Sequence, residues 1–252
     1  MPDPAPQQPI PAATLVIFRD APTPGPPELL MVERAKAMAF AAGAMVFPGG
    51  RIDPDDHAMA ALHPDLPDAA ARIAAIRETV EEAGLAIGLT PPPAPDMLAD
   101  LRRKLHGGVP FGRALHEVGL ELDLTQLTPF ARWLPAHRHM RIFDTLFFLA
   151  RAPSGEATVD RTENVRFTWT TAQGLLDQAD AGRATIIYPT RRNLERLARF
   201  ASFDEAVADA RAHPIRAVTP FTELRGGVEH LCIPDDLGYP VTSEPMTAAL
   251  RG

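Results

Sequence analysis

The feature that most constrains this chain is one stretch that carries three glutamates on a single predicted helical turn. Residues 69–85 read AAARIAAIRETVEEAGL, with apolar side chains at spacings of three and four, which predicts a helix that ends at Gly84 and turns one face to a core. Glu78, Glu81 and Glu82 then stand at i, i+3 and i+4, where like charges repel. A helix that keeps such a turn is expected to hold a cation there.

The expected cation is a hard one. The turn carries neither histidine nor cysteine, and carboxylate oxygens suit Mg²⁺ or Mn²⁺. The alternative is a solvated acidic face, which is the commoner meaning of an isolated E-x-x-E-E helix. The surrounding sequence therefore has to decide between these two interpretations.

The turn resembles the second half of the box of the Nudix hydrolases, G-x5-E-x7-R-E-U-x-E-E-x-G-U, in which U is aliphatic. The matching residues are Arg77, Glu78, Glu81, Glu82, Gly84 and Leu85, and Thr79 stands where an aliphatic residue is usual. The first half is displaced. Residues 47–53 read FPGGRID, which is similar to the family's strand and glycine turn, and counting from Gly50 reaches Asp56 where the family has glutamate.

The box is split. Twenty residues separate Asp56 from Arg77, where the family pattern has seven, so residues 57–68 are interpreted as an inserted loop that bulges from the box. A split box preceded by FPGG resembles the subgroup that includes peroxisomal coenzyme A diphosphatases. This resemblance implies a metal-dependent hydrolase that cleaves the diphosphate bond of a nucleoside diphosphate derivative, with coenzyme A or acyl-CoA as the candidate substrate.

The resemblance also assigns roles to residues. The expected ligands of Mg²⁺ or Mn²⁺ are Glu78, Glu82 and the carbonyl of Gly50. Glu81 is expected to be either a further ligand or the base. Arg77 is expected to orient a box carboxylate, and Asp56 to contact Arg77 from behind the ligands and hold the loop against the helix. Glu163 is the candidate general base; an ordinary surface glutamate is the alternative.

Coenzyme A carries a 3′-phosphate, so a selective site needs a cationic contact beyond the metal. The candidates are Arg34, Arg51, Arg138 and Arg141. The last two belong to the basic segment 135–141, for which a solvated turn is an equal alternative. Met38 and Phe40 are candidates to line a cleft, or equally to cover the core. Two other functions stay open: an ADP-ribose or dinucleotide pyrophosphatase, and a Nudix-like binding module without catalysis.

Composition excludes several classes of protein. The formal charge of −7 disfavours nonspecific nucleic-acid binding, which needs a basic face. One cysteine, Cys232, excludes an internal disulfide. The chain has neither an apolar run that could span a bilayer nor a leader-like N-terminus, so we expect a cytoplasmic protein with a small-molecule diphosphate as partner and no membrane contact.

The expected fold is α/β, a Nudix-type α/β/α sandwich around a mixed sheet, with C-terminal helices. Residues 1–11 are expected to form a disordered Pro-rich tail, 12–240 a single domain and 241–252 a poorly ordered tail. A helical insertion is expected at 95–120. It could cover the substrate cleft, pack against the rest of the domain or form the contact of a homodimer, and the sequence is equally consistent with all three roles. Helix caps are expected at Thr171, Thr190 and Ser202. Strands are expected at 12–18, 28–34, 44–47, 85–89, 127–134, 141–150, 165–169, 215–221 and 228–233.

Overall fold

A mixed sheet forms the centre of the molecule. The computed structural model describes residues 8–35, 43–135, 142–153 and 164–249. Within them, eight strands are arranged as β10-β7-β8-β1-β2-β3, with β4 beside β1 and β9 beside β2. The strands are β1 (Ile10–Arg19), β2 (Glu28–Arg34), β3 (Met45–Val46), β4 (Gly49–Arg51), β7 (Thr128–Trp133), β8 (Phe143–Arg151), β9 (Asn164–Thr171) and β10 (Ala217–Val218). The β1–β8 and β7–β10 pairs are parallel and the remaining pairs antiparallel.

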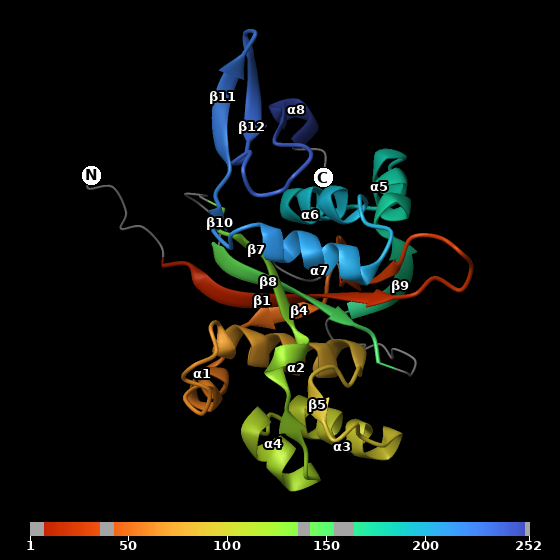
Figure 1. Cartoon of the computed structure of the whole chain (residues 1–252), viewed down its shortest axis with the longest axis vertical. Helices are drawn as coiled ribbons and strands as arrows, with labels where there is room; N and C mark the ends of the chain where they lie inside the picture. Colours follow the sequence, from red (N-terminus) through yellow and green to blue (C-terminus); the bar gives the residue numbers. More distant parts are fainter. Residues whose placement is uncertain (1–7, 36–42, 136–141, 154–163, 250–252) are drawn as a thin grey trace.

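Helices cover both faces of this sheet (Figure 1). The lower layer in the figure contains α1 (Pro54–Ala60), α2 (Ala69–Ala83), α3 (Pro95–His106) and α4 (Phe111–Val118). The upper layer contains α5 (Ala172–Asp180), α6 (Tyr188–Leu197) and α7 (Phe203–Ala212). The predicted α/β/α sandwich around a mixed sheet is therefore confirmed.

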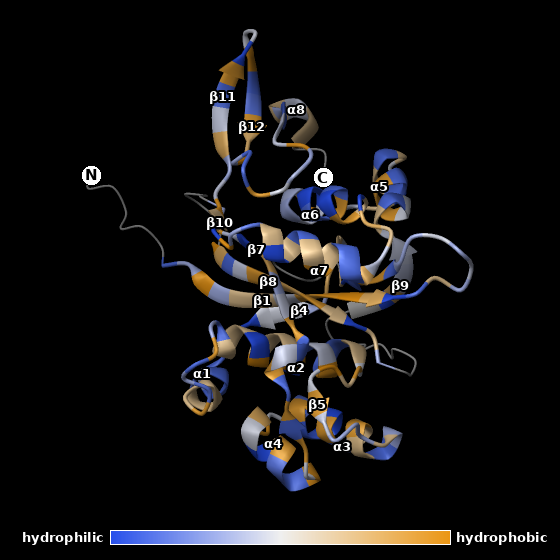
Figure 2. Ribbon diagram, in the orientation of Figure 1, coloured by the Kyte–Doolittle hydropathy of each residue, from blue (hydrophilic) through white to orange (hydrophobic). Residues whose placement is uncertain are grey.

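The sheet separates two apolar cores, because successive residues of a strand point to opposite faces. Leu15 and Ile17 of β1 pack toward α2, whereas Val16 and Phe18 pack toward α5, α6 and α7. Figure 2 shows the resulting band of hydrophobic strands between more polar helices. With both faces covered, β1 has a near-continuous buried run instead of an alternating pattern.

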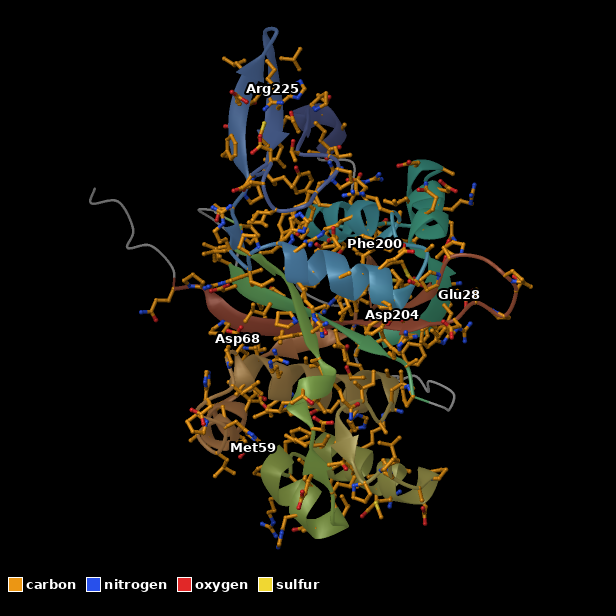
Figure 3. The ribbon with its side chains drawn as sticks, viewed as in Figure 1. Glu28, Met59, Asp68, Phe200, Asp204 and Arg225 are labelled. Carbon is orange, nitrogen blue, oxygen red and sulfur yellow. The ribbon has the colours of Figure 1, made fainter. Side chains whose placement is uncertain are left out.

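The helix α2 is buried on almost all sides, although its sequence predicts one apolar stripe. Ile73, Ile76 and Val80 face the sheet as expected. The outer side is covered by the helices inserted on either side of it, and small residues such as Ala71 and Ala75 are buried there too. The helix follows Asp68, which has φ 57° and is labelled in Figure 3, and it ends at Gly84, φ 61°, as predicted.

Several helices and strands in the structure differ from those expected from the sequence. The insertion at 57–68 is not a simple loop, because its first four residues complete α1. The helix expected to start at Thr190 begins at Tyr188, since Pro189 fits the first helical turn. In the expected 85–89 strand, only Leu89 is extended, as part of β5 (Leu89–Thr90), which pairs with β6 (Glu121–Leu122).

The two chain ends also differ from expectation. β1 starts at Ile10, inside the range expected to be a tail, because it pairs with β8 from there on. Residues 243–249 are ordered as β13 (Ser243–Pro245) and α8 (Met246–Ala249), because β13 pairs with β12 (Val228–Cys232). β12 also pairs with β11 (Phe221–Arg225), and this three-stranded sheet extends away from the sandwich (Figure 1). Cys232 is buried at its base.

Candidate active site

The guanidinium of Arg77 connects the two halves of the split box. Its Nη2 donates to Asp56 Oδ2 at 2.9 Å, and its Nε to Asp56 Oδ1 at 3.1 Å. Nη2 also donates to the Arg51 carbonyl at 2.8 Å. On the helix side, Nη1 donates to Glu78 Oε1 at 2.9 Å and Glu81 Oε1 at 3.3 Å. The contact expected between Asp56 and Arg77 is therefore present despite the insertion.

Asp56 is held in place by the start of α1. Its Oδ2 accepts a hydrogen bond from the backbone N–H of Asp53 at 2.8 Å, which closes a capping box at the helix N-terminus. Pro54 at the first helical position favours this start, and the Asp56 side chain is fully buried. Because α1 orients Asp56, the chain that returns to α2 can be longer than in an unsplit box without displacing the carboxylate.

The glycine turn lies directly against α2. The Gly49 N–H donates to Glu82 Oε2 at 3.0 Å. A Cβ at Gly50 would overlap the Glu78 carboxylate, and one at Gly49 would overlap the Ala13 carbonyl of β1. A side chain is thus excluded at Gly49 by the backbone of β1, whereas one at Gly50 would displace the Glu78 carboxylate, so the turn brings bare backbone next to two glutamates.

Burial dominates the electrostatics of this turn. It raises the pKa of Glu78 to about 8; Arg77 opposes the shift, and the neighbouring Glu82 and Glu81 add to it. Burial likewise raises the pKa of Glu81, against the effect of Arg77. For Arg77 itself, burial opposes the charge, but the Asp56 hydrogen bond and the nearby carboxylates outweigh it and raise its pKa. The site is therefore a crowded, partly desolvated carboxylate cluster with one guanidinium among its described residues.

Two residues at the outer side of α2 were not anticipated from the sequence. Arg102 of α3 donates from Nε to the Glu81 carbonyl and from Nη2 to the Glu82 carbonyl, both at 2.9 Å. A ring nitrogen of His106 lies 3.2 Å from the Glu81 carbonyl. They satisfy carbonyls at the end of α2 that lack partners within the helix. No local pattern distinguishes Arg102 from other basic residues of α3, so only the packing of the helices identifies it.

Thr79 occupies the box position where an aliphatic residue is usual. It is fully buried, and its hydroxyl donates to the Ala75 carbonyl one turn earlier at 2.7 Å. This bond satisfies the polar group inside the helix, so the methyl group can pack as an aliphatic side chain would. The departure from the pattern is therefore compatible with the core.

Among the candidate substrate-binding arginines, Arg34 and Arg51 lie in the described residues. Arg34 ends β2 on the same face as Leu30, which packs toward α2, and its Nε is buried with no hydrogen-bond partner in the part of the chain that the structure describes. The Arg51 side chain is exposed, while its carbonyl accepts from Arg77. Arg138, Arg141, Glu163, Met38 and Phe40 lie outside the described residues.

The donor set fits a hard cation in its chemistry. Glu78, Glu82 and the Gly50 carbonyl offer oxygen ligands only, which is the set preferred by Mg²⁺ and Mn²⁺. The described residues contain no ready-made group of three acidic, histidine or cysteine side chains spaced for a metal. The carboxylates are instead engaged by Arg77 and by the Gly49 N–H. A surface depression of about 390 Å³ beside Arg72 contains none of the predicted site residues.

Comparison with known proteins shows a similarity to solved structures. No protein-family model and no curated protein matches the sequence. Among solved structures, a Nudix hydrolase from Alicyclobacillus acidocaldarius is 32% identical, with 80% of this chain and 96% of that chain covered and a TM-score of 0.69. A MutT Nudix hydrolase from Burkholderia pseudomallei is 19% identical, with 75% and 98% covered and a TM-score of 0.44. In the described residues, no helix is long and apolar enough to cross a membrane.

Proposed function

This chain belongs to the Nudix hydrolase family, and from that premise we propose that it hydrolyses the diphosphate linkage of a nucleoside diphosphate derivative with the help of Mg²⁺ or Mn²⁺. The observation that carries the proposal is the arrangement around Arg77. One guanidinium holds Asp56 and the Arg51 carbonyl on one side and Glu78 and Glu81 on the other. The displaced halves of the box thereby form one site.

We assign the metal ligands to Glu78, Glu82 and the Gly50 carbonyl, with Glu81 as a further ligand or the base. When bound, the cation would neutralise charge on the diphosphate and lower the pKa of an attacking water. The absence of Cβ atoms at Gly49 and Gly50 lets the turn lie directly against β1 and Glu78, which places its backbone next to the carboxylates that would hold the cation. Glu163 remains our candidate general base on sequence grounds.

Arg77 and Asp56 act as positioning residues in this proposal. The bidentate contact to Asp56 fixes the guanidinium plane, so that Nη1 points to Glu78 and Glu81. Arg102 holds the backbone of Glu81 and Glu82 from the outside. Together with the hydrogen bond from the Gly49 N–H to Glu82, these contacts restrict the rotation of the three glutamates, which lowers the cost of arranging them around a cation.

For the substrate we propose coenzyme A or an acyl derivative. This step rests on the split box after FPGG and on Arg34, whose Nε is buried and has no hydrogen-bond partner among the described residues. A cation in that environment gains most from a phosphate partner. Arg51, Arg138 and Arg141 are the other candidates for contacting the 3′-phosphate. We propose that the chain forms a single domain, which extends beyond the expected range 12–240 to include the start of β1 at Ile10 and the elements β13 and α8, and that it acts in the cytoplasm.

The test is product analysis by mass spectrometry with coenzyme A, its 3′-dephospho form and ADP-ribose, each with Mg²⁺ or Mn²⁺ and with a chelator. We expect coenzyme A to be cleaved to 4′-phosphopantetheine and 3′,5′-ADP faster than the dephospho form, and only with metal. Faster cleavage of ADP-ribose, or of a dinucleotide included as a further arm, would favour the pyrophosphatase alternative. No metal-dependent cleavage of any compound would favour a binding module.

A further inference from the structure

The strands β11 and β12 form an arm, defined here as residues 221–232, that projects from the sandwich (Figure 1). The two strands are joined by a tight turn at Gly226 and Gly227, with φ 58° and 82°. On its other edge β12 pairs with β13. Within the described residues no strand pairs with the outer edge of β11, so this edge is open to solvent.

The arm exposes apolar side chains. Leu224 is 74% exposed, Val228 50% and Phe221 49%, and among the described residues the only other large apolar side chain that is exposed is Leu62. An open strand edge with apolar side chains tends to pair with another strand, and monomeric proteins usually block such edges. The charges on β11 limit what can pair with it.

The hairpin geometry determines which backbone groups face outward. Arg225 and Val228 close a two-residue turn, and in such turns the closing pair exchanges both backbone hydrogen bonds. Antiparallel pairs alternate, so Glu223 and Phe221 also bond toward β12. The N–H and C=O groups of Thr222 and Leu224 therefore point to the open edge, ready for a second strand.

We propose that the arm is a homodimer interface, in which β11 pairs antiparallel with β11 of a second copy about a two-fold axis at Leu224. In this register the two Leu224 residues exchange backbone hydrogen bonds, and each Glu223 lies opposite an Arg225 of the second copy. Centring the axis on Glu223 instead would place two glutamates directly opposite each other, which is unfavourable. With the axis at Leu224, the charged side chains of the strand are thus complementary to those of a second copy.

The charge of the whole chain is consistent with contact through the arms. Each copy carries a formal charge of −7, so two copies repel when their bodies approach. The arm places the contact away from the sandwich; Figure 3 shows Arg225 on the arm, above the helices that flank the sheet. Within one chain, Arg225 Nε bonds Glu223 Oε2 at 2.8 Å, so both side chains are already on one face and can be shared with a second copy.

The test uses two single charge reversals in the full-length chain, Glu223→Arg and Arg225→Glu, followed by sedimentation velocity. Each reversal sets like charges opposite each other at two places, so each variant should dimerise at least about tenfold more weakly than the parent chain. In an equimolar mixture, every charge of one variant meets its opposite in the other, and dimers should return. The intrachain pair stays broken in both variants, so recovered intrachain pairing cannot explain the rescue.

Leu62→Ser is the matched control, because it removes an exposed apolar side chain outside the arm and should leave the dimer unchanged. Circular dichroism of each variant checks that the chain is folded. A parent chain that remains monomeric at about 100 µM would overturn the proposal. So would reversals that leave the dimer unaffected, or a mixture that fails to restore it. None of these outcomes depends on which substrate is hydrolysed.

Discussion

Arg77 and Asp56 are 21 positions apart in the chain, and their side chains meet at 2.9 Å with Asp56 fully buried. Another acidic residue, Asp53, lies 3.5 Å from the same guanidinium but is mostly exposed. The buried pair therefore gives the guanidinium its fixed orientation. This relationship makes α1, and not the length of the intervening loop, the element on which the split box depends.

Replacing Asp56 with asparagine should weaken both the fold and the reaction. Asn keeps the shape but leaves the buried Arg77 charge with less compensation, which is expected to lower the free energy of unfolding by about 2 to 3 kcal/mol. Urea denaturation measures this change, and steady-state kinetics should show a lower kcat. Asp65→Asn, on the exposed part of the insertion, is the control and should stay within about 0.5 kcal/mol of the parent. Equal stability of the two variants would contradict the role of the pair.

Replacing Glu82 with glutamine should separate activity from stability. Gln can still accept the hydrogen bond from Gly49, and the change removes one charge from a crowded carboxylate turn. We expect turnover to fall by orders of magnitude while the free energy of unfolding stays the same or rises slightly. Metal-dependent kinetics and urea denaturation test the two parts, with the exposed Glu121→Gln as control. Turnover near that of the parent would remove Glu82 from the site.

Replacing Gly50 with alanine should move a carboxylate without disturbing the core. The added Cβ overlaps the end of the Glu78 side chain, which is flexible enough to turn away. The expected result is a large loss of metal-dependent turnover with less than about 1 kcal/mol of stability lost. Gly25→Ala, where the nearest atom to a Cβ is 3.9 Å away, is the matched control. If Gly50→Ala were as active as Gly25→Ala, the close approach of the Gly50 backbone to the Glu78 carboxylate would not be needed for activity.

The insertion between the box halves should tolerate change only beyond α1. Replacing 61–67 with a Gly/Ser linker keeps α1 and should retain most activity, because loop length changes closure entropy slowly. Replacing 57–68 removes the end of α1, including Met59, which is labelled in Figure 3. The Met59 side chain lies against Gly112 of α4. That variant should lose activity and melt at a lower temperature. Similar activities and melting temperatures for the two variants would show that α1 does not need its last turn.

Glu195 gives a prediction of pH dependence. Burial raises its pKa to about 7, against the effect of Arg192, whose guanidinium lies 2.8 Å away. The folded chain then keeps a proton that the unfolded chain releases above an ordinary pKa near 4.5, so the free energy of unfolding falls as pH rises from about 4.5 to 7. The side chain in the Glu195→Gln variant does not ionise, so its stability lacks this dependence on pH. Its stability relative to the parent should increase across this window, by on the order of 2 kcal/mol in urea denaturation once solvent screening of the partly exposed carboxylate is taken into account; parallel profiles would contradict the shift.

Local signals in the sequence were enough for much of the fold. The periodicity at 28–34 predicts β2 with its observed bounds, and Ser202 and Glu205 predict the start of α7, where the Ser202 hydroxyl accepts the Glu205 N–H at 3.2 Å. The predicted helix start at Thr190 was wrong, and α6 begins at Tyr188. Pro189 is equally acceptable in a first helical turn, so the sequence alone does not decide between the two starts. The prediction also failed after Tyr239, because β13 forms only when β12 is present to pair with it.

For the site, the sequence by itself determined the chemical content, namely three glutamates on one helical turn, an arginine beside them and two glycines after a strand. These follow from spacing along a single element, which is fixed by helical and strand geometry. Tertiary structure alone decided that Asp56 reaches Arg77 across the insertion and that Arg102 holds the end of α2. Those contacts join residues distant in the chain, and their free energy depends on burial and packing that no local pattern records.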